Sequence, residues 1–118
     1  MGFRDESQQA RACRALLGLV RLETLWTFEG PTQKAADLLE ANGGHLSSGE
    51  ALMLTAAFAF WSSAGSCPLS RMLEVFDHGR LTAICSLVLA VSHPSDAYGE
   101  VDRWLSRYER ASLRPVRH

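Results

Sequence analysis

The sequence predicts an all-α fold: a single-domain array or bundle of five to six helices, with two apolar helices at its centre. Apolar residues recur at three- and four-residue spacing in six segments, and no stretch shows the alternation of a β-strand. Glycine, proline and asparagine separate these segments. With 118 residues, 47% of them hydrophobic, the chain can form one core. We therefore expect one helical domain over 1–112 and a flexible basic tail over 113–118.

The first two predicted helices occupy the N-terminal part of the chain. Residues 5–29 contain no proline, and their apolar members follow a helical spacing, so we expect one amphipathic helix that the sequence EGP ends. A shorter helix follows and ends at the sequence ANGG, whose residues readily adopt a left-handed conformation. The inward-facing residues are Ala12, Leu16, Leu19, Val20 and Trp26 in the first helix, and Ala35, Leu38 and Leu39 in the second.

The third predicted helix has a clear start signal. Ser47 and Glu50 have the spacing of a capping box, in which each side chain accepts a hydrogen bond from the other residue's free backbone amide. Residues 51–61 are apolar on every side except at Thr55. Such a helix is expected at the centre of a core.

The fourth and fifth predicted helices are joined by a short turn. The fourth begins at Pro68 and carries an apolar stripe of Leu69, Met72, Leu73 and Phe76. The fifth spans about 80–92, with Asp77 or His78 near its start, and includes the apolar run LTAICSLVLAV. We expect this helix also to be central, with Cys85 buried and unreactive.

The sixth predicted helix is amphipathic. Val101, Trp104, Leu105 and Tyr108 repeat at helical spacing and define its inner face. A set of five arginines lies on its other face and in the tail: Arg103, Arg107, Arg110, Arg114 and Arg117. They form a candidate basic patch for phosphates or an acidic partner, although a solvated helix face explains them as well.

Two fully apolar helices exceed what so small a domain readily buries, because much of a short chain lies near its surface. Either the other four helices cover both completely, or part of an apolar face contacts another protein, and a twofold homodimer is the simplest form of the second case. The residues expected in that interface are Leu16, Leu19 and Phe58.

Composition makes several classes of protein improbable. The formal net charge is −1, so no overall positive field attracts nucleic acid. The two longest apolar stretches have eleven residues each, too few to span a membrane, and the N-terminal residues lack the apolar segment of a signal peptide. Eleven arginines against one lysine suggest a GC-rich genome. We expect a bacterial, cytoplasmic protein without membrane contact.

Cysteine chemistry provides the main alternative. The three cysteines are too few and too scattered for a disulfide framework. Cys67 precedes the fourth helix, whose positive end would favour a thiolate, and the alternative places a site between helices around Cys67, His78 and Trp61. No ligand spacing indicates a metal, and no motif indicates a cofactor or small-molecule substrate.

The sequence is compatible with three functions. The leading hypothesis is a non-enzymatic helical module acting through protein–protein association, as an adaptor, regulatory or structural subunit. The alternative is a small enzyme or ligand-binding protein with an inter-helix site near Cys67 and His78. A weaker alternative is a nucleic-acid-associated protein that uses the arginine-rich C-terminal end.

Overall fold

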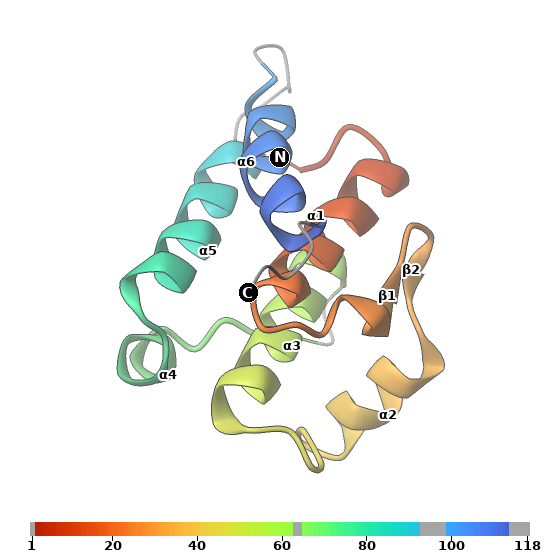
Figure 1. The fold of residues 1–118 in the computed structure, drawn as a ribbon, viewed down its shortest axis with the longest axis vertical. Coiled ribbons are helices and arrows are strands. Elements are labelled where there is room, and N and C mark those ends of the chain that lie inside the picture. The colour runs from red at the N-terminus through yellow and green to blue at the C-terminus, as the bar shows by residue number, and fades with distance from the viewer. Residues whose placement is uncertain (1, 63–64, 93–98, 114–118) are drawn as a thin grey trace, which may run out of the picture.

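The computed structural model describes residues 2–62, 65–92 and 99–113, with side chains described as far as residue 109 (Figure 1). Helices dominate these ranges, so the all-α prediction is confirmed. The elements are α1 (Glu6–Gly18), a 3-10 helix (Glu23–Leu25), β1 (Trp26–Thr27), β2 (Gly30–Pro31), α2 (Gln33–Glu40), α3 (Ser48–Trp61), α4 (Leu69–Val75), α5 (His78–Val91) and α6 (Glu100–Leu113).

Helix α1 occupies the interior and packs against both α3 and α6 (Figure 1). Its inward positions are mostly small, and Ala10, Ala12 and Ala15 are at most 1% exposed. Small side chains let neighbouring helices approach closely, while Leu16 and Leu17 fill the space between them. The centre of the core therefore lies at α1 and α3.

The predicted capping box at the start of α3 is confirmed. The Ser47 hydroxyl accepts a hydrogen bond from the Glu50 amide at 3.2 Å, and the Glu50 carboxylate accepts one from the Ser47 amide at 2.9 Å. These bonds lower the pKa of Glu50, because they favour its ionised form. Two of the free amides at this helix end are thereby satisfied.

The prediction of a single helix over 5–29 is wrong beyond Gly18. Arg21 adopts a positive φ of 62°, and the chain then forms the 3-10 helix and the β1–β2 hairpin. Trp26 is still buried, as its spacing suggested, with ring centroids 5.0 Å from Phe58 and 5.8 Å from Trp61. The irregular backbone thus still places Trp26 in the core. The prediction that the chain contains no strand is wrong for this short hairpin.

The hairpin sets the entry into α2. Gly30 has φ 137°, and a Cβ atom there would come within 2.8 Å of the Trp61 ring, so the turn requires glycine. Thr32 caps α2: its hydroxyl accepts a hydrogen bond from the Ala35 amide at 3.2 Å and donates one to the Leu25 carbonyl at 2.9 Å. Threonine therefore ties α2 to the end of the 3-10 helix.

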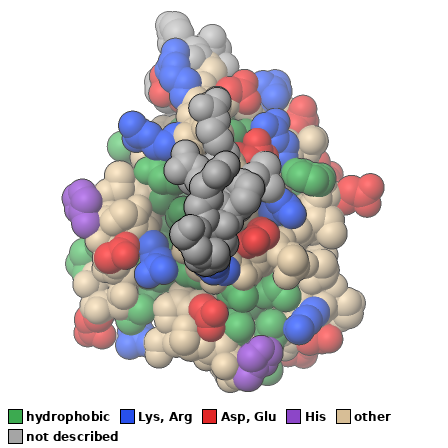
Figure 2. All heavy atoms as spheres, in the orientation of Figure 1, with side chains coloured by type: hydrophobic (Ala, Val, Ile, Leu, Met, Phe, Trp, Pro, Cys, Tyr) green, Lys and Arg blue, Asp and Glu red, His purple; other side chains and the backbone are tan. Residues whose placement is uncertain are grey.

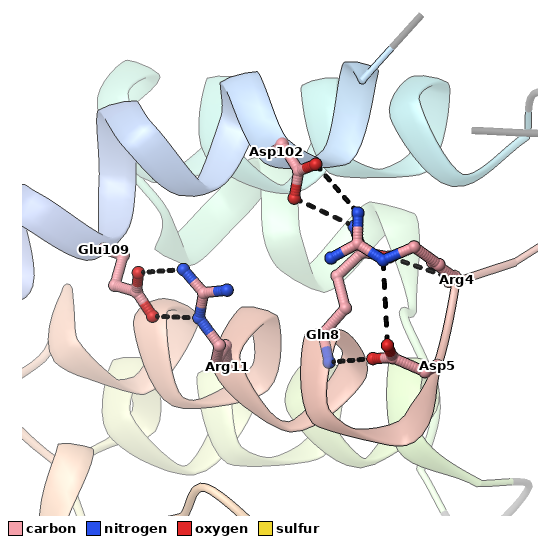
Figure 3. Close-up of polar contacts among 6 residues, drawn as sticks. All are labelled: Arg4, Asp5, Gln8, Arg11, Asp102 and Glu109. Atoms are coloured by element: carbon pink, nitrogen blue, oxygen red, sulfur yellow. Dashed lines mark hydrogen bonds and ion pairs between the residues drawn. The ribbon is translucent and has the colours of Figure 1, made fainter. Parts of the chain in front are cut away.

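Polar contacts fasten α6 to α1 (Figure 3). The Arg11 guanidinium donates to both carboxylate oxygens of Glu109, at 2.9 and 2.7 Å, and this bond raises the pKa of Arg11. Arg4 and Gln8 donate to Asp102 at 2.9 and 3.1 Å and lower the pKa of its carboxyl group. Beneath these contacts lies the predicted apolar face of α6, comprising Val101, Trp104, Leu105 and the partly buried Tyr108.

The expectation of two central apolar helices is not confirmed, because α5 is buried on one side only. Ala83, Ile84 and Leu87 face the core, whereas Val88 is 47% and Leu89 68% exposed. Figure 1 shows α4 and α5 along one side of the molecule, opposite α2 and the hairpin. Helix α5 packs mainly on α6, and the side that carries Val88 and Leu89 is exposed.

The C-terminal boundary differs slightly from the prediction. Helix α6 continues through Leu113, so a tail beginning at 113 starts too early. The rest of the predicted basic tail lies outside the described residues. No helix in the described ranges is both long and apolar enough to cross a membrane.

Candidate interaction surface on α4 and α5

The exposed large hydrophobic side chains are concentrated on two helices that are consecutive in the chain. Of five such residues in the described ranges, Leu69 and Leu73 of α4 are each 62% exposed, and Val88 and Leu89 of α5 are 47% and 68% exposed. The fifth, Phe28, is at the hairpin, where the Arg14 guanidinium lies 4.9 Å from its ring centroid. Hydrophobic side chains also reach the surface on the left of Figure 2, where α4 and α5 lie in Figure 1.

We define the α5 outer face as Cys85, Val88 and Leu89, and the α4 leucines as Leu69 and Leu73. Cys85 is exposed, so the expectation that it is buried is wrong. At 100° per residue, Val88 and Leu89 project on either side of Cys85, opposite the core-facing side of the helix. An inward stripe and an outward stripe of apolar residues therefore share one helix.

The local sequence leaves this face with little capacity for polar contacts. Residues 81–92 contain no charged side chain. The hydroxyl of Thr82 donates to the carbonyl of His78 at 2.7 Å, and that of Ser86 donates to the carbonyl of Thr82 at 2.6 Å. Because these hydroxyls bond to their own helix, covering the face would leave no unpaired hydroxyl donor there.

Two grooves border the α5 outer face. One, of about 450 Å³, lies between α5 and α6 and is lined by Leu89, Trp104 and Arg107 among others. The other, of about 700 Å³, lies between α5, α3 and the N-terminal segment, and its apolar lining includes Phe3 and Phe60. The face is therefore a ridge between two shallow depressions that could accept side chains of a partner.

Charges at the edges of the region occur as ion pairs. Arg71 lies 3.5 Å from Glu74 on α4, and Arg80 lies 3.6 Å from Asp77 at the start of α5. The Arg103 guanidinium is 2.5 Å from the Glu100 carboxylate on α6. Paired charges weaken long-range repulsion, so the rim does not oppose the approach of another protein.

The interface residues expected from the sequence lie elsewhere. Leu16 is fully buried and Phe58 is 5% exposed, both inside the core of the single chain, while Leu19 is partly buried against that core. Leu16 and Phe58 are therefore not available to a partner while the domain is folded. Helical periodicity could not separate them from Val88 and Leu89, because a core-facing and a partner-facing stripe have the same spacing.

The expected reactivity of Cys67 is not supported. Although Cys67 is exposed as a residue, neighbouring atoms partly desolvate its thiol and raise the pKa, opposite to the expected effect of the helix end. His78 is exposed in the first turn of α5, and the Trp61 ring packs on Trp26. Cys13 is buried, which raises the pKa of its thiol strongly.

The described residues form neither a metal-binding cluster nor a concentrated group of arginines. Within the described ranges, no three histidine, cysteine or acidic side chains converge as a metal site. Of the candidate basic patch, Arg103 is paired with Glu100 and Arg107 is exposed beside the α5–α6 groove. The Arg110 side chain and all of Arg114 and Arg117 lie outside the described part of the chain.

Comparison with known proteins finds no family model, no curated protein and no solved structure that matches this chain.

Proposed function

We propose that this protein is a small, non-enzymatic helical module that acts by binding another protein chain through the α5 outer face and the α4 leucines. The observation that carries the proposal is the exposure of four large apolar side chains on two helices that are consecutive in the chain: Leu69, Leu73, Val88 and Leu89. Large apolar side chains exposed on a protein surface can mark an interaction site.

The energetics favour covering this surface. Complete burial of a leucine or valine side chain is worth about 1.5–3 kcal/mol, and these four are half to two-thirds exposed. Since residues 81–92 carry no charge, burial of the α5 outer face does not incur the large cost of desolvating an ion. A partner would therefore gain several apolar contacts at little electrostatic cost.

The alternatives have weaker support. An enzyme centred on Cys67 would need an activated thiol, whereas desolvation raises the pKa of that thiol. A nucleic-acid-binding protein would need a concentrated positive surface. Here Arg11 of α1 forms an ion pair with Glu109 of α6, and Arg103 of α6 forms one with Glu100. We therefore favour association.

Site-specific photo-crosslinking tests the proposal. In a Cys67→Ser chain, Cys85 is labelled with a benzophenone maleimide and irradiated in an extract of the source organism. The matched control carries the label at the exposed Thr24, using Cys67→Ser, Cys85→Ser and Thr24→Cys together. Cys13 is fully buried and should remain unlabelled in both chains.

We expect a discrete adduct from position 85 whose crosslinked peptide can be identified by mass spectrometry, and no corresponding adduct from position 24. Introducing Leu89→Glu should abolish it. An adduct with this chain itself and one with a different protein would each support the proposal. Equal labelling from both positions, or no adduct at all, would overturn it.

A further inference from the structure

The larger of the two grooves beside α5 has acidic side chains and no basic ones. This groove, of about 700 Å³, is lined by Asp5 and Glu6, and no lysine, arginine or histidine lines it among the described residues. The groove between α5 and α6 differs, because it contains Glu100 together with Arg103 and Arg107. We call the larger depression, between the start of α1, the end of α3 and the end of α5, the acidic groove.

The two carboxylates of the acidic groove have different surroundings. The Asp5 carboxylate accepts a hydrogen bond from the Gln8 amide at 2.8 Å, which offsets the positive end of α1, and it lies 3.7 Å from the Arg4 guanidinium. Arg4 also donates to Asp102 at 2.9 Å, so its one positive charge serves two carboxylates (Figure 3). Glu6 is exposed in the first turn of α1 and forms no ion pair with another described residue. The charge of Glu6 is therefore available to a cation from outside the domain.

Two helix ends add to the negative potential of the acidic groove. The last turns of α3 and α5 line it through Ala59, Phe60 and Val91. The C-terminal end of a helix carries a partial negative charge, and neither last turn contains a basic residue that offsets this charge. The Gln9 side-chain amide donates to the Phe60 and Trp61 carbonyls at 2.8 and 3.2 Å, which satisfies these groups without adding a positive charge. Fixed features of the fold therefore favour a cation at this groove.

The rest of the lining is apolar and continues into the α5 outer face. Phe3, Phe60, Val88 and Val91 line the acidic groove, and Val88 also belongs to the α5 outer face. Sites that bind small ligands have volumes of about 300–1,000 Å³, so the groove has room for a large side chain. A protein chain that covers Val88 from outside therefore reaches the groove as well.

We infer that the acidic groove receives an apolar side chain of the partner protein that is flanked in sequence by lysine or arginine, an inference that rests on the proposed function. The apolar side chain contacts Phe3, Phe60 and Val88, and the flanking cation lies near Glu6 and the ends of α3 and α5. Complementary charges across an interface select the partner and speed its association. The acidic groove thus determines the chemistry of the partner, while the α5 outer face and the α4 leucines contribute apolar area.

Three capped peptides that differ only in charge test the inference. Their sequences are Lys-Phe-Lys, Gln-Phe-Gln and Glu-Phe-Glu, each with an acetylated N-terminus and an amidated C-terminus. Binding to the isotopically labelled wild-type chain is followed through its backbone amide NMR signals. We expect Lys-Phe-Lys to shift the signals of Phe60, Val88 and Val91, and to bind about threefold more tightly than Gln-Phe-Gln and about tenfold more tightly than Glu-Phe-Glu. Added NaCl should reduce this preference, because mobile ions screen exposed charges.

Single substitutions assign the preference to the acidic groove. Glu6→Gln should lower the affinity for Lys-Phe-Lys by about threefold and leave the affinity for Gln-Phe-Gln unchanged. The control is Glu40→Gln, which removes the same charge at an exposed residue of α2, outside the groove lining, and should have no effect. Val88→Ser should weaken the binding of both peptides by a similar factor, because it removes an apolar contact and no charge. Circular dichroism should show the wild-type helix content in each variant.

Several outcomes would overturn the inference. These are equal affinities for the three peptides, signal shifts confined to other parts of the chain, no shift with Lys-Phe-Lys up to about 10 mM, or a charge preference that Glu6→Gln leaves intact.

The photo-crosslinking experiment separates this inference from the proposed function. A Cys85 adduct with a partner peptide that has no basic residue next to its apolar contacts would leave the proposed function standing while this inference fails. The absence of any adduct, with charge-selective binding of the peptides intact, would overturn the proposed function and with it the assignment of the groove to a protein partner.

Discussion

Helices α3 and α5 have nearly the same sequence character and different environments. Each has 14 residues and an apolar composition around its circumference. Helix α3 is covered by α1, α2 and α4, whereas α5 packs mainly on α6 and exposes Val88 and Leu89. The comparison shows that apolar composition alone does not determine whether a helix is covered by the rest of its own chain.

The largest difference should appear between two leucines. Leu54 of α3 is 1% exposed and Leu89 of α5 is 68% exposed. We expect Leu54→Ala to lower the free energy of unfolding by about 2–5 kcal/mol, because it leaves a cavity, and Leu89→Ala to change it by less than about 0.5 kcal/mol. Urea denaturation at low protein concentration measures both, and similar losses would mean that α5 is as buried as α3.

Two glycines extend the comparison to backbone packing. A Cβ atom on Gly65 would meet the Thr55 carbonyl oxygen of α3 at 2.3 Å, whereas one on Gly79 of α5 would have its nearest neighbour at 3.6 Å. We expect Gly65→Ala to destabilise the protein by about 1–3 kcal/mol and Gly79→Ala to stabilise it by up to about 1 kcal/mol. Thermal melts show whether each variant is less or more stable than the wild type. An unchanged melting temperature for Gly65→Ala would show that the loop does not pack tightly on α3.

Removing the N-cap should destabilise α3 and α5 by similar amounts, unlike substitutions on the faces of the two helices. Ser47 caps α3, and Asp77 caps α5 by accepting a hydrogen bond from the Arg80 amide at 2.9 Å. Alanine at either position should cost about 1 kcal/mol. Glu50→Gln should cost less than Ser47→Ala, as measured by denaturation. A silent Asp77→Ala would indicate that the first turn of α5 is frayed.

The smallest predicted effect is a dependence on pH. The pKa values of Glu50 and Asp102 are lowered in the folded state, so these carboxylates add stability above their unfolded pKa of about 4, and this is lost as the pH falls through the folded values. Asp102→Asn should flatten the decline in stability between pH 5 and pH 2 by less than about 1 kcal/mol, because Arg4 and Asp102 are half exposed. Glu40→Gln is the control, and an equal flattening there would contradict this assignment.

Local signals made much of the fold predictable. The start of α3 at Ser47 and the inward face of α6 were read correctly, because capping boxes and amphipathic periodicity are encoded within one or two turns. The end of α1 at Gly18 was not predicted, because Leu19 to Trp26 retain helical spacing although the chain there is irregular and still buries Trp26. The candidate site was predicted only as an excess of apolar surface, since its position depends on which helices cover which.

Thiol labelling of the wild-type protein as a function of concentration tests most directly whether α5 keeps an apolar face open for a partner. Cys13 is 0% exposed, whereas Cys67 and Cys85 are exposed, so three cysteines report on the core, the loop before α4 and the α5 outer face. With a maleimide pulse read by mass spectrometry, we expect Cys85 to react in the dilute folded protein and to become protected as concentration rises or a partner is added. Cys67 should keep its reactivity, and Cys13 should stay unmodified throughout. A Cys85 that is protected at every concentration would contradict the exposed face, and one that reacts equally under all conditions would contradict its role in association.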